Sequence, residues 1–205
     1  MPFPASDMPG PNAPLSDNCD NSTQPKANAV AGFNAWTSAG FPANKLVLGL
    51  PSYGYVSTSD AHRLRQRANL NSHPVYAREP RDGQVKVVAA DGDTQVLFRE
   101  LVGQGALALV PSSGDHRPPI FDGAGGFVKH WDSCSSTPFL RSSWADQVIT
   151  YDDPESLAMK ADFVRQTGML GVNIFDTHGD TDEWHLTDTV QKAVKGFYDF
   201  EGAEV

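Results

Sequence analysis

The stretch of residues 148–182 limits what this chain can fold into more than any other, because it carries the start and stop signals of a helix followed by a strand. Asp153 can accept hydrogen bonds from the first free N–H groups of a helix, and Pro154 suits the first helical position. Apolar residues then recur at three- and four-residue spacing until Gly168, which can adopt the left-handed conformation that ends a helix. Residues 169–175 form a short, mostly apolar run, as expected of a parallel strand covered on both faces.

The polar residues directly after this strand are the first candidates for chemistry, because α/β folds place functional groups at strand ends. Carboxylates there could act as acid and base in hydrolysis, and together with imidazoles they could chelate a divalent cation. The catalytic candidates are Asp180, Asp182 and Glu183, and the metal candidates are His178, Asp180, Asp182 and His185. We favour the alternative that these residues cap the next helix and face solvent, so neither a metal nor another cofactor is expected.

The same order of helix, glycine and strand occurs earlier in the chain. The apolar pattern predicts a helix that begins near Asn28, ends at Gly40 and is followed by a strand over residues 46–50. A further helix is predicted over residues 186–200. The two ends of the sequence are therefore predicted to form neighbouring units of one parallel α/β layer.

Between these units the pattern changes to that of antiparallel strands. Residues 84–88 and 95–98 flank the turn-forming residues 90–93 and are predicted to form a hairpin. Residues 111–126 are rich in glycine, proline and serine and are predicted to form a loop. Two further strands are predicted, because apolar and polar residues alternate over residues 127–131 and 147–151.

The predicted elements divide the chain into three parts. Residues 1–27 have little apolar periodicity and form a loop-rich segment. Residues 28–56 and 148–205 form the parallel α/β part, and residues 57–147 form an inserted antiparallel α+β part. The overall class is therefore α/β with an α+β insertion.

Composition excludes several classes of partner. A net charge of −9 and a pI near 5.0 argue against nucleic acid and anionic membrane surfaces, which select a surplus of lysine and arginine. No apolar run approaches the roughly 20 residues of a membrane span, and residues 1–5 lack the basic and apolar regions of a signal peptide. We therefore expect neither a nucleic-acid partner nor a membrane partner.

The two cysteines leave the redox compartment open. Cys19 and Cys134 could form one disulfide that closes a long loop, or they could be two buried thiols. Two cysteines without a Cys-x-x-Cys pair make a zinc site improbable. The tripeptide Asn21-Ser22-Thr23 is an acceptor sequence for N-linked glycans and favours a secreted ancestor.

Three blocks of this sequence, in order, resemble fungal chitinases of glycoside hydrolase family 18. Residues 151–156, Tyr-Asp-Asp-Pro-Glu-Ser, are similar to the start of the last barrel helix, and Phe175 stands at the aromatic position of the next strand. Residues 33–54 resemble the preceding helix and the seventh barrel strand, and residues 127–140 resemble an insertion of the fungal members. The resemblance implies a partial TIM barrel, its last two βα units, with residues 57–147 as an inserted subdomain that forms one wall of the substrate groove.

The resemblance also implies which residues contact a sugar. Phe175 replaces the tryptophan on which a sugar ring stacks, and Tyr53 and Tyr55 lie at the groove end of a strand, where the family commonly has arginine at position 55. Trp131 lies in the inserted part. For Phe175 and Trp131 the alternative is an ordinary core aromatic. The implied partner of these four residues is a chitin-type oligosaccharide.

The catalytic motif of the family, Asp-x-x-Asp-x-Asp-x-Glu on one strand, is not found in the 205 residues. We therefore expect a catalytically incomplete, extracellular chitinase-like protein that binds glycans containing N-acetylglucosamine or acts through protein contacts. One alternative is an active glycoside hydrolase that uses another carboxylate pair among Asp152, Asp153, Asp180 and Glu183. A third possibility is a hydrolase that depends on a divalent metal.

Two parallel strands cannot close a barrel, so the strand edges and the inner face of the layer need another form of cover. The insertion could fold over the layer, two chains could pair edge to edge, or the sequence could be part of a longer protein. We predict a small mixed sheet, with self-association through the unclosed edge as a possible partner interaction.

Overall fold

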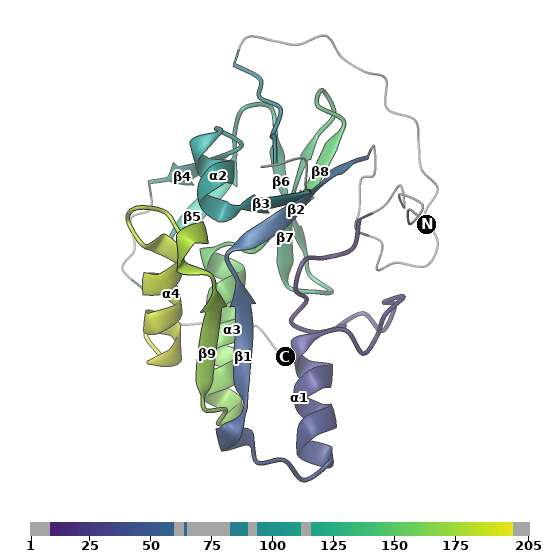
Figure 1. The fold of residues 1–205 in the computed structure, drawn as a ribbon, viewed down its shortest axis with the longest axis vertical. Helices are drawn as coiled ribbons and strands as arrows, with labels where there is room; N and C mark the ends of the chain where they lie inside the picture. The colour runs from purple at the N-terminus through teal and green to yellow at the C-terminus, as the bar shows by residue number, and fades with distance from the viewer. Residues whose placement is uncertain (1–8, 60–63, 65–82, 90–93, 112–115, 199–205) are drawn as a thin grey trace.

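The computed structural model describes residues 9–59, 64, 83–89, 94–111 and 116–198 (Figure 1). The helices are α1 (Ala29–Ser38), α2 (Phe98–Gly103), α3 (Pro154–Thr167) and α4 (His185–Val194), with short 3-10 turns η1 (Ala43–Lys45) and η3 (Thr177–Gly179). The strands are β1 (Val47–Pro51), β2 (Tyr53–Thr58), β3 (Gln95–Leu97), β4 (Leu107–Val110), β5 (Ile120–Gly123), β6 (Val128–Asp132), β7 (Thr137–Ser142), β8 (Gln147–Thr150) and β9 (Gly171–Phe175). None of the helices in these ranges is both long and apolar enough to cross a bilayer.

Strands β1 and β9 pair in parallel, which confirms that the two ends of the sequence form one α/β layer. Residues on one face of the pair, among them Leu50 and Ile174, pack toward the core and α3. The opposite face is exposed, with Val47 at 50% and Phe175 at 64% of their full accessibility. The prediction that the strand over residues 169–175 is covered on both faces is therefore wrong, because a sheet of two strands cannot curl around to enclose its own inner face.

Helix α3 begins and ends where the sequence predicts. The Asp153 carboxylate accepts a hydrogen bond from the Ser156 backbone N–H at 2.9 Å, and the Ser156 hydroxyl accepts one from the Asp153 N–H at 3.0 Å. Gly168 ends the helix in the left-handed conformation, with φ of 67°. The predicted apolar stripe is buried, since Leu157 and Ala161 have no exposed surface.

The two other predicted helices differ in how well their ends are predicted. Helix α1 begins after Asn28, whose side chain accepts a hydrogen bond from the Ala31 N–H at 2.8 Å, and Gly40 follows its end with φ of 86°. Helix α4 ends at Val194, short of the predicted end at residue 200. The earlier end follows from Gly196, whose φ of 72° is incompatible with continuing the helix.

A five-stranded antiparallel sheet has the order β3-β2-β8-β7-β6 (Figure 1). Strands β3, β7 and β6 lie within residues 57–147, whereas most of β2 and β8 lies outside them, so the sheet crosses the predicted boundaries of the inserted part. The sheet contains β6 and β8, which confirms the strands predicted over residues 127–131 and 147–151. Strand β7 lies between them, and no strand was predicted there. The structure has three separate sheets among the described residues instead of the predicted single mixed sheet.

The hairpin predicted from residues 84–88 and 95–98 is wrong. Strand β3 pairs with β2, and residues 84–88 are not a strand. The backbone of Val87 bonds instead to the side-chain amide of Gln147 at 3.0 and 2.8 Å, and that of Val88 bonds to Gln104 at 2.9 and 3.0 Å. Two glutamine side chains thus satisfy the backbone groups that a partner strand would otherwise bind. The turn residues 90–93 lie outside the described residues.

The loop predicted over residues 111–126 is also partly wrong, because residues within it form β5, which pairs with β4. Strand β4 and helix α2 were not predicted. Phe121 on β5 is 1% exposed and stacks edge-on against Phe98 of α2, with ring centroids 5.1 Å apart. Burial of this aromatic pair explains why a segment rich in loop-forming residues becomes a strand.

The N-terminal segment has no helix or strand over residues 9–27, as predicted, yet it is attached firmly to the antiparallel sheet. Cys19 and Cys134 form a disulfide, which settles the alternative left open by the sequence. Beside it, the Leu15 N–H donates to the Ser135 carbonyl at 2.9 Å, and the Asn18 N–H donates to the Cys134 carbonyl at 3.0 Å. The segment therefore covers one face of the sheet, while the other face packs into the main core.

Candidate functional site

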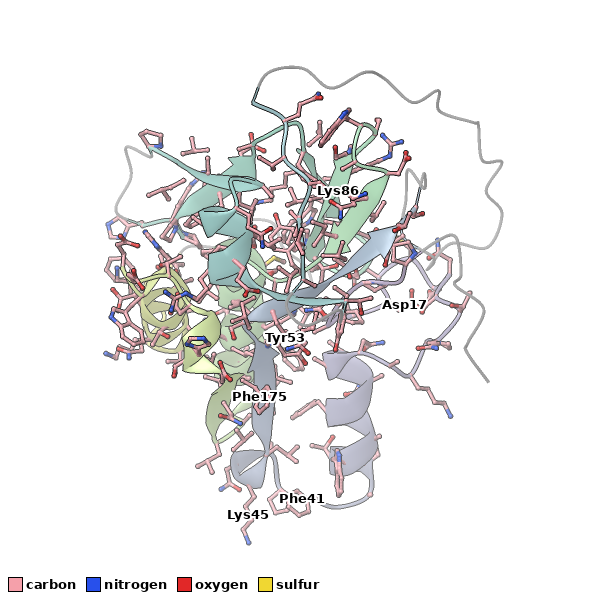
Figure 2. The ribbon with its side chains drawn as sticks, turned by 45° about the horizontal axis from the view of Figure 1, so that its top comes forward. Asp17, Phe41, Lys45, Tyr53, Lys86 and Phe175 are labelled. Atoms are coloured by element: carbon pink, nitrogen blue, oxygen red, sulfur yellow. A yellow bond between two sulfur atoms is a disulfide. The ribbon has the colours of Figure 1, made fainter. Side chains whose placement is uncertain are left out.

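An aromatic cluster of Tyr53, Tyr55 and Phe175 lies where the parallel strands meet the antiparallel sheet. Tyr53 is at its centre, with its ring centroid 5.8 Å from that of Tyr55 and 6.4 Å from that of Phe175, both in edge-to-face geometry. Tyr53 and Phe175 are neighbours in Figure 2. Because Phe175 is 64% exposed and Tyr55 is 39% exposed, the cluster presents ring surface to solvent.

The ends of β1 and β9 hold Phe175 in place. Pro51 and Phe175 are partners in the parallel register, and the next N–H, of Ser52, donates to the Phe175 carbonyl at 3.1 Å. The Ser52 hydroxyl donates to the Asp176 carbonyl at 2.5 Å. Gly179 approaches so closely that a Cβ there would lie 2.2 Å from the Ser52 hydroxyl. The backbone that carries the exposed ring is therefore fixed on both sides.

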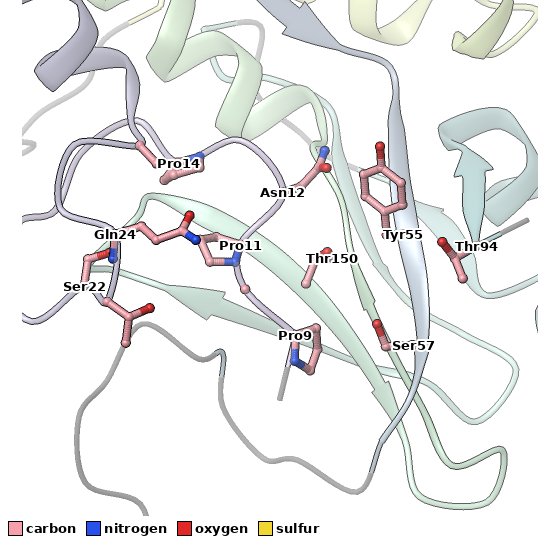
Figure 3. A pocket seen from close by; sticks show the side chains of 13 residues that line it. Pro9, Pro11, Asn12, Pro14, Ser22, Gln24, Tyr55, Ser57, Thr94 and Thr150 are labelled. Atoms are coloured by element: carbon pink, nitrogen blue, oxygen red, sulfur yellow. The ribbon is translucent and has the colours of Figure 1, made fainter. Parts of the chain in front are cut away.

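A cleft of about 440 Å³ adjoins the aromatic cluster between the N-terminal segment and the antiparallel sheet (Figure 3). Tyr55 belongs to both, so the cluster and the cleft are continuous. The described residues that line it are Pro9, Gly10, Pro11, Asn12, Pro14, Ser22, Thr23, Gln24, Ala27, Tyr55, Ser57, Thr94 and Thr150. None of them carries a charged side chain, and several carry a hydroxyl or an amide, so the cleft suits a neutral ligand with many hydroxyl groups.

Asn12 joins the two walls of the cleft. Its side-chain nitrogen donates to the Tyr53 carbonyl at 2.8 Å and lies 3.4 Å from an oxygen of Asp152. Burial, followed by the neighbouring Tyr55 and the charge of Asp152, raises the pKa of Tyr53 above its ordinary value. The Tyr53 phenol therefore stays protonated at neutral pH and keeps its hydrogen-bond donor.

Trp131, the fourth predicted sugar-binding residue, is not brought to this cluster. Residues paired across antiparallel strands point to the same face, so the pairs of Tyr55 with Thr150, Thr150 with Phe139, and Phe139 with His130 place Tyr55 and His130 on one face. Successive residues of a strand alternate between faces, so Trp131 points to the opposite face. It is 36% exposed there.

Asp152 and Asp153 are buried and paired with lysines. Lys160, itself 2% exposed, donates to an oxygen of Asp152, and the Ser156 hydroxyl donates to the same oxygen at 2.7 Å. Lys129 forms an ion pair with Asp153 at 2.7 Å. Burial alone would lower the pKa of Lys129, but Asp153 and Glu155 outweigh it and raise that pKa above its ordinary value. Both carboxylates therefore act as partners of cations.

Asp180 binds the start of α4. One carboxylate oxygen accepts from the N–H groups of Thr181 at 2.8 Å and Leu186 at 2.9 Å, and the other accepts from Thr187 N–H at 2.8 Å. Asp180 is 1% exposed, so these bonds satisfy the buried carboxylate. This geometry is that of a helix-capping residue at the positive end of the helix dipole.

The other candidates after β9 are dispersed. Asp182 is exposed and pairs with Arg99 of α2 at 3.0 Å, and the His185 imidazole lies 2.7 Å from the Thr181 hydroxyl. Glu183 is exposed, with one oxygen 4.0 Å from His185, and His178 lies in η3. Within the described ranges, no three His, Cys, Asp or Glu side chains are grouped so that they could hold a metal ion.

The cleft residues Asn12, Ser57, Thr94 and Thr150 were not identified from the sequence. They come from the N-terminal segment, β2, the approach to β3, and β8. Each is a common polar residue with no motif around it. The pairing of β2 with β3 and β8 brings Ser57, Thr94 and Thr150 together, and the N-terminal segment adds Asn12.

Comparison with known proteins gives a consistent result. The profile of Glycosyl hydrolases family 18 matches residues 3–180. A chitinase-like effector of Moniliophthora roreri is 30% identical over 178 residues, which are 83% of this chain and 42% of that protein.

Among solved structures, a chitinase from Rhizomucor miehei superposes with a TM-score of 0.64 at 25% identity, over 90% of this chain and 48% of the other. Human YKL-39, described as a pseudo-chitinase with retained chitooligosaccharide binding properties, has a TM-score of 0.62 at 18% identity, over 92% of this chain and 46% of its own. This second likeness concerns the fold alone. The chain spans less than half the length of each of these relatives.

Proposed function

Because the chain belongs to glycosyl hydrolase family 18, we propose that it binds chitin-type oligosaccharides at the aromatic cluster and the adjoining cleft, without cleaving them. The observation that carries this proposal is the continuity of the two features through Tyr55. Exposed aromatic rings offer a flat apolar surface for the C–H face of a sugar ring. Uncharged hydroxyls and amides beside them can bind the sugar's hydroxyl and acetamido groups.

Two observations support binding without cleavage. The family's Asp-x-x-Asp-x-Asp-x-Glu motif is absent from the 205 residues. Asp152, Asp153 and Asp180, three of the four carboxylates of the alternative hydrolase, already have lysine or backbone N–H partners. The description of YKL-39 as a pseudo-chitinase that retains chitooligosaccharide binding shows that such a combination occurs on this fold.

The remaining parts of the assignment follow from the same relatives. We assign β1 and β9, with α3 and α4, to the last two units of a TIM barrel, and residues 57–147 to the family's insertion. The disulfide and the likeness to chitinase-like effectors support an extracellular location. Self-association through the edges of the β1–β9 pair stays a prediction, and a strictly monomeric mass in light scattering at high concentration would contradict it.

Calorimetric titration with tetra-N-acetylchitotetraose tests the binding. We expect Phe175→Ala and Tyr55→Ala each to weaken binding by about 2- to 12-fold, since an aromatic contact contributes roughly 0.5–1.5 kcal/mol beyond area burial. Trp36→Ala is the matched control, because Trp36 is an aromatic residue 58% exposed on α1, outside the aromatic cluster and the cleft. Absence of heat with the unmodified chain, or equal losses in all three variants, would overturn the proposal.

A fluorogenic chitotriose glycoside tests the absence of cleavage. We expect no release of fluorophore above that of a heat-denatured sample. Turnover that Asp180→Asn or Glu183→Gln abolishes would establish the alternative hydrolase. Turnover that a chelator abolishes and a divalent cation restores would establish the metal-dependent alternative.

A further inference from the structure

We propose that Asn21 is a site of N-linked glycosylation, and that the attached glycan begins at the rim of the cleft, across it from Tyr55. Asn21-Ser22-Thr23 is the only Asn-x-Ser/Thr sequence with a residue other than proline at its centre in the 205 residues. It lies in an irregular segment of the surface, where Asn18, Cys19 and Asp20 before it and Thr23 after it are exposed.

The side chain of Asn21 leaves its attachment atom available. Its oxygen is buried without a hydrogen-bond partner, and no hydrogen bond among the described residues uses its nitrogen. The loop is held instead by Asp17, whose carboxylate accepts from the backbone N–H groups of Asn21 at 3.3 Å and Ser22 at 3.2 Å. Substitution on the Asn21 nitrogen therefore breaks no bond that fixes the loop.

The neighbouring disulfide supports the required compartment. Cys19 is two residues before Asn21, and its bond to Cys134 is of the kind that forms in the oxidising lumen through which secreted chains pass. That lumen is also where N-linked glycans are added. In the transfer, the bond between the first sugar's C1 and a lipid diphosphate breaks, C1 bonds to the Asn21 nitrogen, which loses a proton, and the lipid diphosphate leaves.

The glycan has a consequence for the cleft. Ser22 and Thr23, the other two residues of the acceptor sequence, line the cleft, and Figure 3 shows Ser22 on the wall opposite Tyr55. A glycan on Asn21 thus begins at one rim of the space that the proposed ligand enters. Resting on the proposed function, we infer that the glycosylated chain binds chitin-type oligosaccharides more weakly than the unmodified chain.

Intact mass of the full chain, secreted from a eukaryotic host behind a standard leader, tests the modification. We expect excess mass that peptide-N-glycosidase removes, that Asn21→Gln and Thr23→Ala abolish, and that Thr23→Ser retains. Asn18→Gln is the matched control, because Asn18 is an exposed asparagine of the same loop outside the acceptor sequence, and it should keep the glycan.

Two outcomes would overturn the modification. One is a secreted chain that has the disulfide and the mass of the bare polypeptide. If the chain is not secreted, translation with microsomes gives the same test, and a chain that is protected from protease yet carries no glycan would refute the site.

Titration with tetra-N-acetylchitotetraose tests the effect of the glycan on binding, and it compares the glycosylated chain with the Asn21→Gln variant from the same host. Equal affinity refutes the shielding of the cleft, whereas absence of binding to both refutes the proposed function and leaves the glycan itself established.

Discussion

Replacing both Cys19 and Cys134 with serine should lower the free energy of unfolding by up to about 4.8 kcal/mol. The two cysteines are 115 residues apart in sequence, so their bond restricts more than half of the unfolded chain. With this separation the chain-entropy relation gives about 16 cal/mol/K, or about 4.8 kcal/mol at 25 °C. The loss is large against the roughly 5–15 kcal/mol by which domains are usually stable.

The folded state should change much less than the unfolded state. The hydrogen bonds of Leu15 to Ser135 and of Asn18 to Cys134 do not involve the sulfur atoms, so the N-terminal segment can stay in place. Urea unfolding followed by fluorescence gives the free energy, and the denaturant slope should rise because an unlinked chain exposes more surface. Unmodified chain in reducing buffer is the matched control and should equal the double variant. A loss below about 1 kcal/mol in both samples would refute the chain-entropy reasoning.

Buried polar groups lead to four further predictions. The Tyr151 hydroxyl is buried without a partner, so Tyr151→Phe should raise stability by about 1 kcal/mol in urea unfolding at pH 7, and a loss would contradict this. Burial raises the pKa of Tyr151 well above its ordinary value, so the folded chain holds this proton more tightly and stability should fall as the pH rises above about 10, less steeply in Tyr151→Phe. Lys160→Met leaves the Asp152 carboxylate buried without its cation and should lower stability by about 3–5 kcal/mol, part of which Asp152→Asn in the same chain should restore. Asp180→Ala should lower stability by about 1–2 kcal/mol and speed amide exchange at the first turn of α4, and unchanged exchange there would refute its capping role.

Elements whose start and stop signals are local could be predicted from the amino-acid sequence. Asp153 and Gly168 delimit α3 because a capping carboxylate and a left-handed glycine act through bonds to residues within one helical turn. Asn28 marks the start of α1 for the same reason. The alternation of helix, glycine and apolar strand was enough to predict the parallel pairing of β1 with β9.

Which strands pair, and which of their faces are exposed, depends on packing between distant parts of the chain. Residues 84–88 have the pattern of a strand, but Gln147 and Gln104 satisfy the backbone of Val87 and Val88, and these contacts depend on packing far from that segment. The register from β2 to β6 places Trp131 on the opposite face of the sheet from Tyr55, and the residue types alone cannot show this. The same register lines the cleft with Ser57 and Thr150.

The candidate site shows the same division. Its aromatic members Tyr53, Tyr55 and Phe175 were expected from the resemblance to family 18, because each lies in or directly beside a stretch of sequence that is similar to that family. The polar wall of the cleft was not, since serine and threonine are common and acquire a role only from their neighbours in space. The disulfide was also undecided by the sequence, because a covalent bond between Cys19 and Cys134 requires the fold to bring their Cα atoms to 5.2 Å.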